Sequence, residues 1–293
     1  DGSFKQVSGP RKFIFPEDHG PHNDYGIEWW YFTGNLQDSY KSHYGYELTL
    51  FRIGIPKTPN ARATDWEVEN VYMGHIAVTD VSNKEFHSGE RFSRDSIDLA
   101  GASISKPDSF SVWLKDWVVS GKGLDQPEIS LIANHGDIAL DLSLQATKPL
   151  VLQGDNGYSR KGEGQSNASY YYSISRLETS GTLRIRDRVS NVSGTSWMDR
   201  EWSTSALSAN QIGWDWFALQ LNNNHELMYY QMLLSDLSAD QMSEGIIIDP
   251  AAETSSLSSD DVEIQNLDYW ISPSGTSYPV QWSMKIPTYS TEL

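Results

Sequence analysis

Gly26-Ile27-Glu28-Trp29-Trp30-Tyr31-Phe32-Thr33-Gly34-Asn35-Leu36 is the stretch that decides the fold. Aromatic residues dominate it, which favours a strand that packs its rings and carries one carboxylate, Glu28, among them. A shorter echo, Gly213-Trp214-Asp215-Trp216-Phe217, repeats the order glycine, any residue, acid, tryptophan, aromatic. The echo suggests an internal duplication, with one copy in each half of the chain.

The rest of the chain has the two-residue period of β-strands. Between residues 40 and 53, Tyr44, Tyr46, Leu48 and Leu50 alternate with Gly45, Glu47, Thr49 and Phe51. Many such short segments, separated by turn residues and with hardly any helical period, predict an all-β fold of antiparallel barrels. We place one domain at residues 1–178 and a second at 179–293, and expect the second to lack its last strands because the sequence stops within a strand pattern.

Composition excludes several classes of function. The 293 residues carry a net charge of −17, which disfavours nucleic acid as a partner. Because there is no cysteine, disulfides, thiolate metal sites and cysteine nucleophiles are excluded. We expect no transmembrane segment, since no apolar run approaches the ~20 residues that span a bilayer. The chain begins with Asp1 instead of Met, which fits removal of an export signal as well as a trimmed chain, so the compartment stays open.

Two carboxyls lie among indole rings, namely Glu28 beside Trp29 and Trp30, and Asp215 between Trp214 and Trp216. Burial among rings raises the pKa of a carboxyl, as a general acid requires. The structural alternative is that each acid pairs with an arginine such as Arg184 or Arg200 and serves only the fold.

Further candidates lie elsewhere in the chain. Asp199-Arg200-Glu201 sits between two tryptophans, where the arginine can stack on an indole and hold a carboxylate. His75 is a candidate ligand or proton donor beside Tyr46, Tyr72 and Tyr229, with a satisfied core histidine as the alternative. The acidic, histidine-containing loop at 17–24 lacks the spacing of a known metal site, and we predict no metal and no cofactor.

Several motifs together resemble a known family. The runs are Phe15-Pro16-Glu17-Asp18-His19-Gly20-Pro21-His22, the opening stretch, Trp197-Met198-Asp199-Arg200-Glu201-Trp202, Trp214-Asp215-Trp216 and Asp268-Tyr269-Trp270. In order and spacing they resemble the AttH family, a relative of the carotenoid 1,2-hydratases, over nearly the whole chain. The resemblance implies two lipocalin-like (calycin) barrels, each closed at one end by a first-strand tryptophan against an arginine from a later strand.

The resemblance implies handling of lipids, hydration of a polyene or its cyclisation. The chain departs from the hydratases in having Asp199-Arg200-Glu201-Trp202 where they have Asp-His-x-Trp, and no carboxylate in Leu227-Met228-Tyr229-Tyr230-Gln231.

We therefore expect binding or handling of a long apolar ligand, a lipid or an isoprenoid, in a barrel or at the junction of the two. The alternative is a cofactor-independent enzyme acting on a polyene or lipid, and a third hypothesis is carbohydrate binding. The candidate proton donors are Asp199, Glu28 and Asp215. The expected ligand contacts are His22, Trp30, Tyr46, His75, Arg200, Trp202, Trp214, Trp216, Tyr229, Gln231 and Tyr269.

Overall fold

The computed structural model describes residues 4–56, 68–96, 98–105, 107–204, 207–289 and 291–292. The chain forms two compact units, Asp1–Arg160 with Gly164–Ala206, and Lys161–Glu163 with Leu207–Leu293. The boundary expected at residue 178 falls inside one strand, β12 (Ala168–Ile185), which pairs with its neighbours on both sides of that position. Ser180 and Gly181 lie within this strand, where Gly181 allows the backbone to pass close to Asp141.

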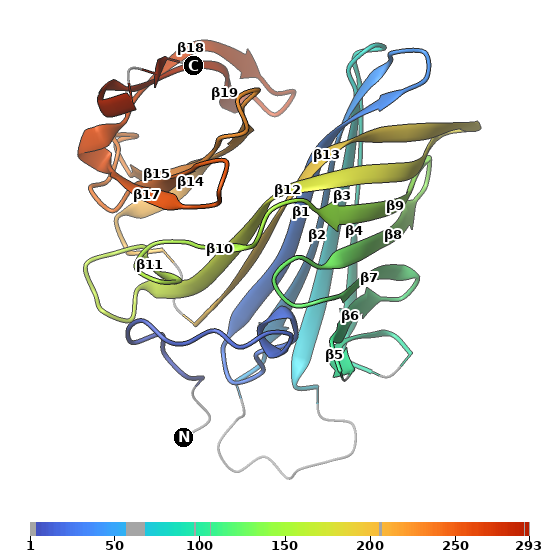
Figure 1. Ribbon diagram of the computed structural model, residues 1–293, viewed down its shortest axis with the longest axis horizontal. Coiled ribbons are helices and arrows are strands. Elements are labelled where there is room, and N and C mark those ends of the chain that lie inside the picture. The colour runs from blue at the N-terminus through green and yellow to red at the C-terminus, as the bar shows by residue number, and fades with distance from the viewer. Residues whose placement is uncertain are drawn as a thin grey trace. The chain divides into compact units, whose positions relative to one another are not determined.

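The first unit is one large, nearly closed antiparallel barrel sheet (Figure 1). Its strands follow the order β4-β3-β2-β1-β13-β12-β9-β8-β7-β6-β5, so the opening stretch occupies a central position. The bounds are β1 (Ile27–Asp38), β2 (His43–Gly54), β3 (Asn70–Asp80), β4 (Glu85–Arg94), β5 (Ala100–Ser105), β6 (Ser109–Leu114), β7 (Trp117–Lys122), β8 (Glu128–His135), β9 (Ile138–Ala146) and β13 (Arg188–Ser203), with β10 (Val151–Leu152) and β11 (Tyr158–Arg160) also paired to β12.

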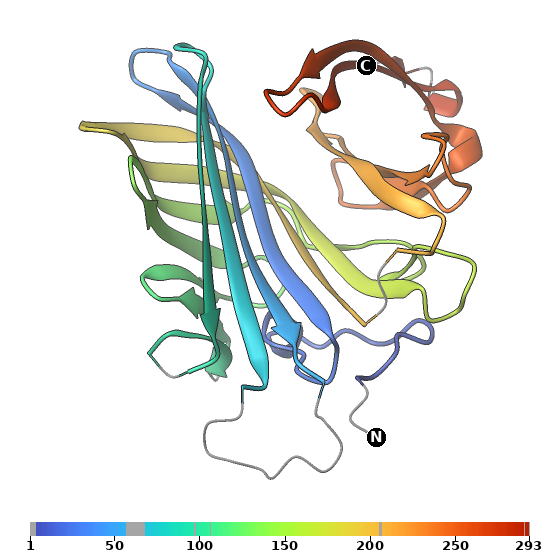
Figure 2. The same ribbon diagram turned by 180° about the vertical axis from the view of Figure 1, so that it is seen from behind.

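The sheet curls so that β6 and β8 face β3 and β4 across an apolar core (Figure 2). The fit is tight, since a Cβ placed on Gly74 of β3 would lie 2.9 Å from both Leu114 and Trp117. Alternate residues of β1, β2, β3, β6, β8 and β9 fill this core, among them Phe32, Leu48 and Leu131, which are fully buried. The inner face of the first barrel is therefore packed with the chain's own side chains.

The two faces of the sheet carry different side chains. In β13, Met198 and Arg200 point to the same side as Trp30 and Phe32 of β1, whereas Asp199 lies opposite Tyr31 on the other side. A bulge in β12 between Ile174 and Leu177 breaks the register. Because it reverses the alternation, Ser173 before it and Glu178 after it both lie on the outer face.

The second unit contains two small antiparallel sheets. They are β14 (Gln211–Gln220), β15 (Glu226–Leu234), β16 (Glu244–Ile248) and β17 (Thr254–Ser258), and β18 (Glu263–Ile271), β19 (Ser277–Ile286) and β20 (Thr291–Glu292). A core including Leu227, Leu257 and Met284 joins them. Over the described parts of the chain, the helical segments are three 3-10 turns, η1 (Glu17–His19), η2 (Ser259–Asp261) and η3 (Pro287–Tyr289). None of the described helical segments is long and apolar enough to cross a bilayer.

Candidate active site

One end of the first barrel is closed by Trp30 and Arg200. The guanidinium carbon of Arg200 lies 3.9 Å from the centre of the Trp30 ring, and both side chains are fully buried. The indole Nε1 donates to the carbonyl oxygen of His19 at 2.8 Å, which ties η1 to the barrel end. The tryptophan and arginine that the family resemblance implied are thus in contact in this barrel.

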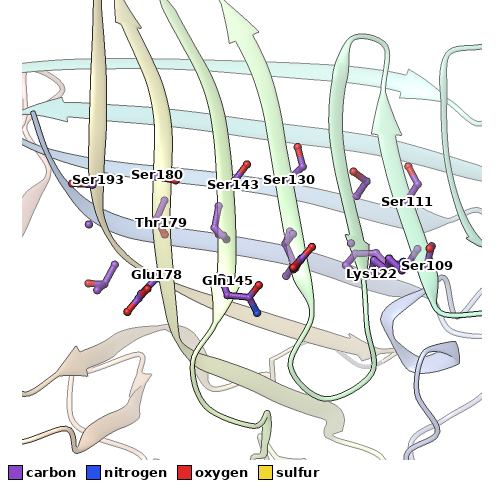
Figure 3. Close-up of a pocket in the computed structure, with 18 of the residues that line it drawn as sticks. Ser109, Ser111, Lys122, Ser130, Ser143, Gln145, Glu178, Thr179, Ser180 and Ser193 are labelled. Atoms are coloured by element: carbon purple, nitrogen blue, oxygen red, sulfur yellow. The ribbon is translucent and has the colours of Figure 1, made fainter.

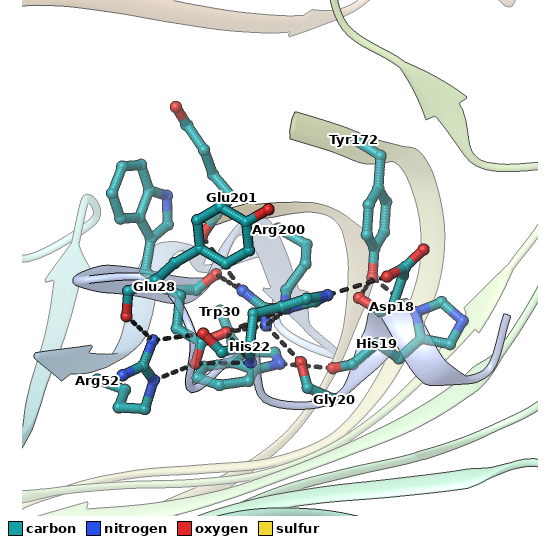
Figure 4. Close-up of polar contacts among 12 residues, drawn as sticks. Asp18, His19, Gly20, His22, Glu28, Trp30, Arg52, Tyr172, Arg200 and Glu201 are labelled. Atoms are coloured by element: carbon teal, nitrogen blue, oxygen red, sulfur yellow. Dashed lines mark hydrogen bonds and ion pairs between the residues drawn. The ribbon is translucent and has the colours of Figure 1, made fainter. Parts of the chain in front are cut away.

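Glu28 is part of this closure (Figure 4). Its carboxylate accepts hydrogen bonds from Arg52 and Arg200, and the backbone N–H of His22 lies 3.0 Å from Oε2. Burial would raise the pKa of Glu28, but the charge of Arg200, the His22 hydrogen bond and the charge of Arg52 outweigh it and hold the pKa well below its usual range. Glu28 is therefore an ionised structural group and a poor proton donor.

His22 links this network to the loop before β1. Its ring stacks on Trp202, with centroids 3.7 Å apart and planes 7° from parallel. Nδ1 of His22 lies 3.0 Å from the Arg200 guanidinium and 3.3 Å from Oε2 of Glu28, and Nε2 lies 2.9 Å from Oδ1 of Asp18. Asp18 in turn accepts two hydrogen bonds from Arg11 at 2.8 Å. The acidic loop is thus held by ion pairs, and within the described residues no three His, Asp or Glu side chains converge as a metal site.

Asp199 lies on the opposite face of β13 from Arg200 and has different surroundings. Three groups donate to its carboxyl: the Ser173 hydroxyl at 2.5 Å and the Trp197 indole at 2.7 Å, both to Oδ1, and the Tyr171 hydroxyl at 2.9 Å to Oδ2. Burial raises the pKa of Asp199 to about 7, the three hydrogen bonds oppose the rise only in part, and neighbouring Glu201 adds to it. Asp199 is therefore a buried acid that holds its proton near neutral pH.

The hydrogen bonds fix where that proton sits. Gln153 donates from Nε2 to the Ser173 oxygen at 2.8 Å, which leaves the Ser173 hydroxyl hydrogen to Asp199. Because Oδ1 already accepts from Ser173 and from the Trp197 indole, which can only donate, the carboxyl proton belongs on Oδ2, beside the Tyr171 hydroxyl.

A wide groove of about 1130 Å³ lies on the same outer face of the sheet (Figure 3). Its side chains alternate with core residues along β6 to β9, β12 and β13, so it lies outside the packed core. Six serines in direct cross-strand register run through it: Ser111, Ser120, Ser130, Ser143, Ser180 and Ser193. Charged and amide groups flank the serines, namely Lys122, Glu128, Gln145 and Glu178. A ligand here meets hydroxyls and polar groups as well as apolar surface.

The groove and Asp199 are neighbours along β13. Ser193 and Thr195 line the groove, Trp197 follows, and Asp199 comes two residues later on the same face. Asp199 lies four positions after Thr195 along the strand, which corresponds to roughly 13 Å. The acid therefore lies beyond one end of the groove, with the Trp197 side chain between them.

The structure distributes the remaining predicted residues of the first unit over both faces. Tyr46 is buried in the core, where its hydroxyl lies 2.7 Å from that of Ser196, and Tyr72 is buried on the same side. His75 lies on the outer face, with its ring edge against Phe51 at 5.4 Å. The grouping of His75 with Tyr46 and Tyr72 was therefore wrong, because strand alternation sends them to opposite faces.

The predicted residues of the second unit lie on β14, β15 and β18. Asp215 is half-buried opposite Gln231, and burial raises its pKa. Tyr229 is buried, which raises its pKa to about 12. Trp216 lies opposite Tyr230, while Trp214 and Tyr269 are each 53% exposed. Within the given sequence no arginine follows Arg200, so a second tryptophan–arginine closure at Trp214-Asp215-Trp216 stays a prediction.

Sequence reasoning missed the groups around Asp199. Tyr171 and Ser173 bind Asp199 across the β12–β13 pair, and Glu47 lies on the same outer face, alternating with core residues Tyr46 and Leu48. Burial raises the pKa of Glu47 to about 7, against a lowering by its hydrogen bond from Thr49. The two-residue period had already placed Glu47 away from the aromatic face, and that was the available signal.

Comparison with known proteins identifies the family. The AttH-like family model matches residues 6–293, and the chain belongs to this family, as the sequence motifs predicted. The crystal structure of an AttH protein from Nitrosomonas europaea superposes with a TM-score of 0.84 at 29% identity, covering 96% of this chain and 83% of the other.

More distant relatives carry the names of enzymes. Kievitone hydratase from Nectria haematococca shares the fold, with a TM-score of 0.65 at 17% identity over 97% of this chain and 82% of the hydratase. The dehydratase asqC of Emericella nidulans is 23% identical over 166 residues, which are 54% of this chain and 45% of the dehydratase. The chain thus spans less than half the length of that curated relative.

Proposed function

We propose that this chain is an enzyme that adds water to, or removes it from, a carbon–carbon double bond of a largely apolar substrate, with Asp199 as the proton donor. The observation that carries the proposal is the Asp199 carboxyl, buried, bound by three donors and with its pKa raised to about 7. A general acid works best when its pKa is close to the working pH, because it is then both protonated and able to release the proton.

Binding of a lipid, which the sequence favoured, does not require such a group. A buried carboxyl without a nearby cation makes the folded chain less stable whenever it ionises. Glu28 is buried as well, but it has two arginine partners, which keep it ionised at the barrel end. A protein that only held an apolar ligand would be more stable with an uncharged residue in place of Asp199.

The named relatives support the class of reaction. One relative is named a hydratase and another a dehydratase, and addition and removal of water are the two directions of one type of reaction, each of which needs an acid that exchanges a proton with the substrate. The groove ends roughly 13 Å from Asp199 along β13, which supports an elongated substrate that reaches the acid with one end while its polar groups meet the serines of β6 to β9, β12 and β13. Acyclic isoprenoids are suitable probes, because protonation of a trisubstituted double bond gives a tertiary carbocation.

The test uses geranylgeraniol and squalene with the purified chain in H₂¹⁸O, and mass spectrometry of the products. We expect a product heavier by one labelled water, and a loss of at least about 100-fold in rate for Asp199→Asn, in line with general acid catalysis. Asp141→Asn, an exposed carboxyl of β9, is the matched control and should keep the rate. Full activity of Asp199→Asn would refute the assignment of the acid, and no product from either probe would count against the reaction class.

A further inference from the structure

A second carboxyl, Glu47, shares the outer face with Asp199. Tyr31 of β1 stands directly opposite Asp199 of β13 on one side and Thr49 of β2 on the other. Glu47 lies two residues from Thr49 along β2, opposite Thr33. Two strand spacings and two residues separate Glu47 from Asp199, so their Cα atoms are about 12 Å apart. The two carboxyls therefore flank the Tyr31 side chain.

The electrostatics of Tyr31 agree with this placement. Burial raises the pKa of the Tyr31 hydroxyl, and the negative charges of Glu47 and Asp199 raise it further. The Tyr31 hydroxyl is therefore neutral near pH 7, with both carboxyls close enough to act on it. Glu47 itself accepts from the Thr49 hydroxyl, which is buried and holds the carboxyl in place.

We propose that Glu47 is a second catalytic residue, the base that takes a proton from water while Asp199 protonates the substrate carbon. This rests on the proposed function. In hydration, the Asp199 proton forms a C–H bond as the π bond breaks, the water oxygen bonds to the adjacent carbon, and one water proton goes to Glu47. Asp199 ends ionised and Glu47 protonated, and transfer of that proton back through solvent restores the pair. Dehydration runs the same steps in reverse.

The proposed acid–base pair requires that Glu47 and Asp199 bind and release protons in the same pH range. Burial places the pKa values of Glu47 and Asp199 both at about 7, so near neutral pH one can be protonated while the other is ionised. The other ionisable groups that these strands carry on this face are Tyr31 of β1, His43 of β2, His75 of β3, Glu90 and Arg94 of β4, Tyr171, Glu178 and Arg184 of β12 and Glu201 of β13.

The activity test separates the two roles in D₂¹⁸O with geranylgeraniol. Without its base, Glu47→Gln should still let Asp199 deliver deuterium to the double bond, and the cation should then lose a proton to give deuterated alkene isomers. Formation of ¹⁸O-labelled alcohol should fall at least about 100-fold. Asp199→Asn should lose both products. The matched control Glu90→Gln removes an exposed charge from the same face and should keep both.

The outcomes distinguish the two proposals. Undiminished alcohol formation by Glu47→Gln would overturn the role of Glu47 and leave Asp199 standing, whereas neither product from the wild-type chain would overturn both. Glu47→Asp keeps the carboxylate on a side chain that is shorter by one methylene. If hydration depends on this carboxylate, Glu47→Asp should be faster than Glu47→Gln and slower than wild type.

A second measurement needs no substrate. Carboxyl ¹³C NMR should show Glu47, identified by the signal missing from Glu47→Gln, titrating near pH 7. In Asp199→Asn that titration should move down by about one pH unit, the effect of a charge roughly 10 Å away at an effective dielectric constant of about 20. Titration of Glu47 near pH 4.5, unchanged by Asp199→Asn, would refute the pair whatever the activity.

Discussion

Replacing Asp199 with asparagine should make the protein more stable at high pH, and the gain can be worked out from the structure. The pKa of Asp199 is raised from 3.8 to about 7. Between these values the folded chain holds a proton that the unfolded chain has released, so each rise of one pH unit costs the folded state about 1.4 kcal/mol. The full penalty, on the order of 4 kcal/mol, is reached above pH 7 and is absent below pH 3.8.

Asparagine preserves the hydrogen bonds while removing the ionisation. Its Oδ1 can accept from Ser173 and from the Trp197 indole as the carboxyl does, and its amide N–H can donate to the Tyr171 oxygen. The stability of Asp199→Asn should therefore equal that of the wild-type chain near pH 4 and exceed it by up to about 4 kcal/mol at pH 8.

The assay is urea denaturation of both proteins at several pH values from 4.5 to 8, with the difference in midpoint converted through a shared m value. Other titrating groups are common to the two proteins and cancel in the difference. Asp141→Asn on the exposed side of β9 should change the free energy of unfolding by less than about 0.5 kcal/mol throughout. A difference between Asp199→Asn and wild type that does not change with pH, or that favours wild type at pH 8, would refute the argument that Asp199 is a buried acid.

Three further predictions concern the barrel end and the groove. Glu28→Gln leaves the buried cations Arg52 and Arg200 without their partner and should lower the free energy of unfolding by about 3–5 kcal/mol, so a urea-measured loss below about 1 kcal/mol would contradict the closure. His19 is fully buried and burial lowers its pKa to about 4, so the unfolded chain binds a proton that the folded chain does not between pH 6.5 and 4. His19 alone should cost the folded chain about 3 kcal/mol as the pH falls through this window, so wild type should lose stability relative to His19→Gln, which thermal unfolding of both proteins at pH 4.5 and 7 can check. Ser143→Leu projects a larger side chain into the groove and should weaken substrate binding, seen as a higher KM, while stability changes little and Ser143→Ala stays close to wild type.

Much of the fold could be predicted from local patterns. The two-residue period identified the strands, and the tryptophan and arginine motifs gave the family and the closure of the first barrel by Trp30 and Arg200. These features depend on residues close in sequence or on motifs in a fixed order. The division between the compact units could not be predicted in this way, because β12 runs through the boundary that was expected at residue 178.

The surroundings of Glu28 and Asp199 depend on contacts between residues that are far apart in the sequence, which local patterns do not predict. Ser173 reaches Asp199 through the pairing of β12 with β13, and Gln153 reaches Ser173 from the segment after β10. Neither contact has a local sequence signature here. Arg52, which donates to the Glu28 carboxylate, lies in the segment 40–53. The alternation of side chains in that segment predicted a strand but not this ion pair.

The contrast between Glu28 and Asp199 follows from the alternation of β13. Arg200 is the residue next to Asp199 in sequence, which suggested an ion pair within the motif. Because neighbouring residues of a strand point to opposite faces, Arg200 turns inward to Trp30 and Glu28, and Asp199 turns outward to Tyr171 and Ser173. One short motif thus supplies the cation that keeps Glu28 ionised and, one residue away, a carboxyl that this cation does not neutralise. The motif therefore closes the barrel through one face and provides the proposed acid through the other.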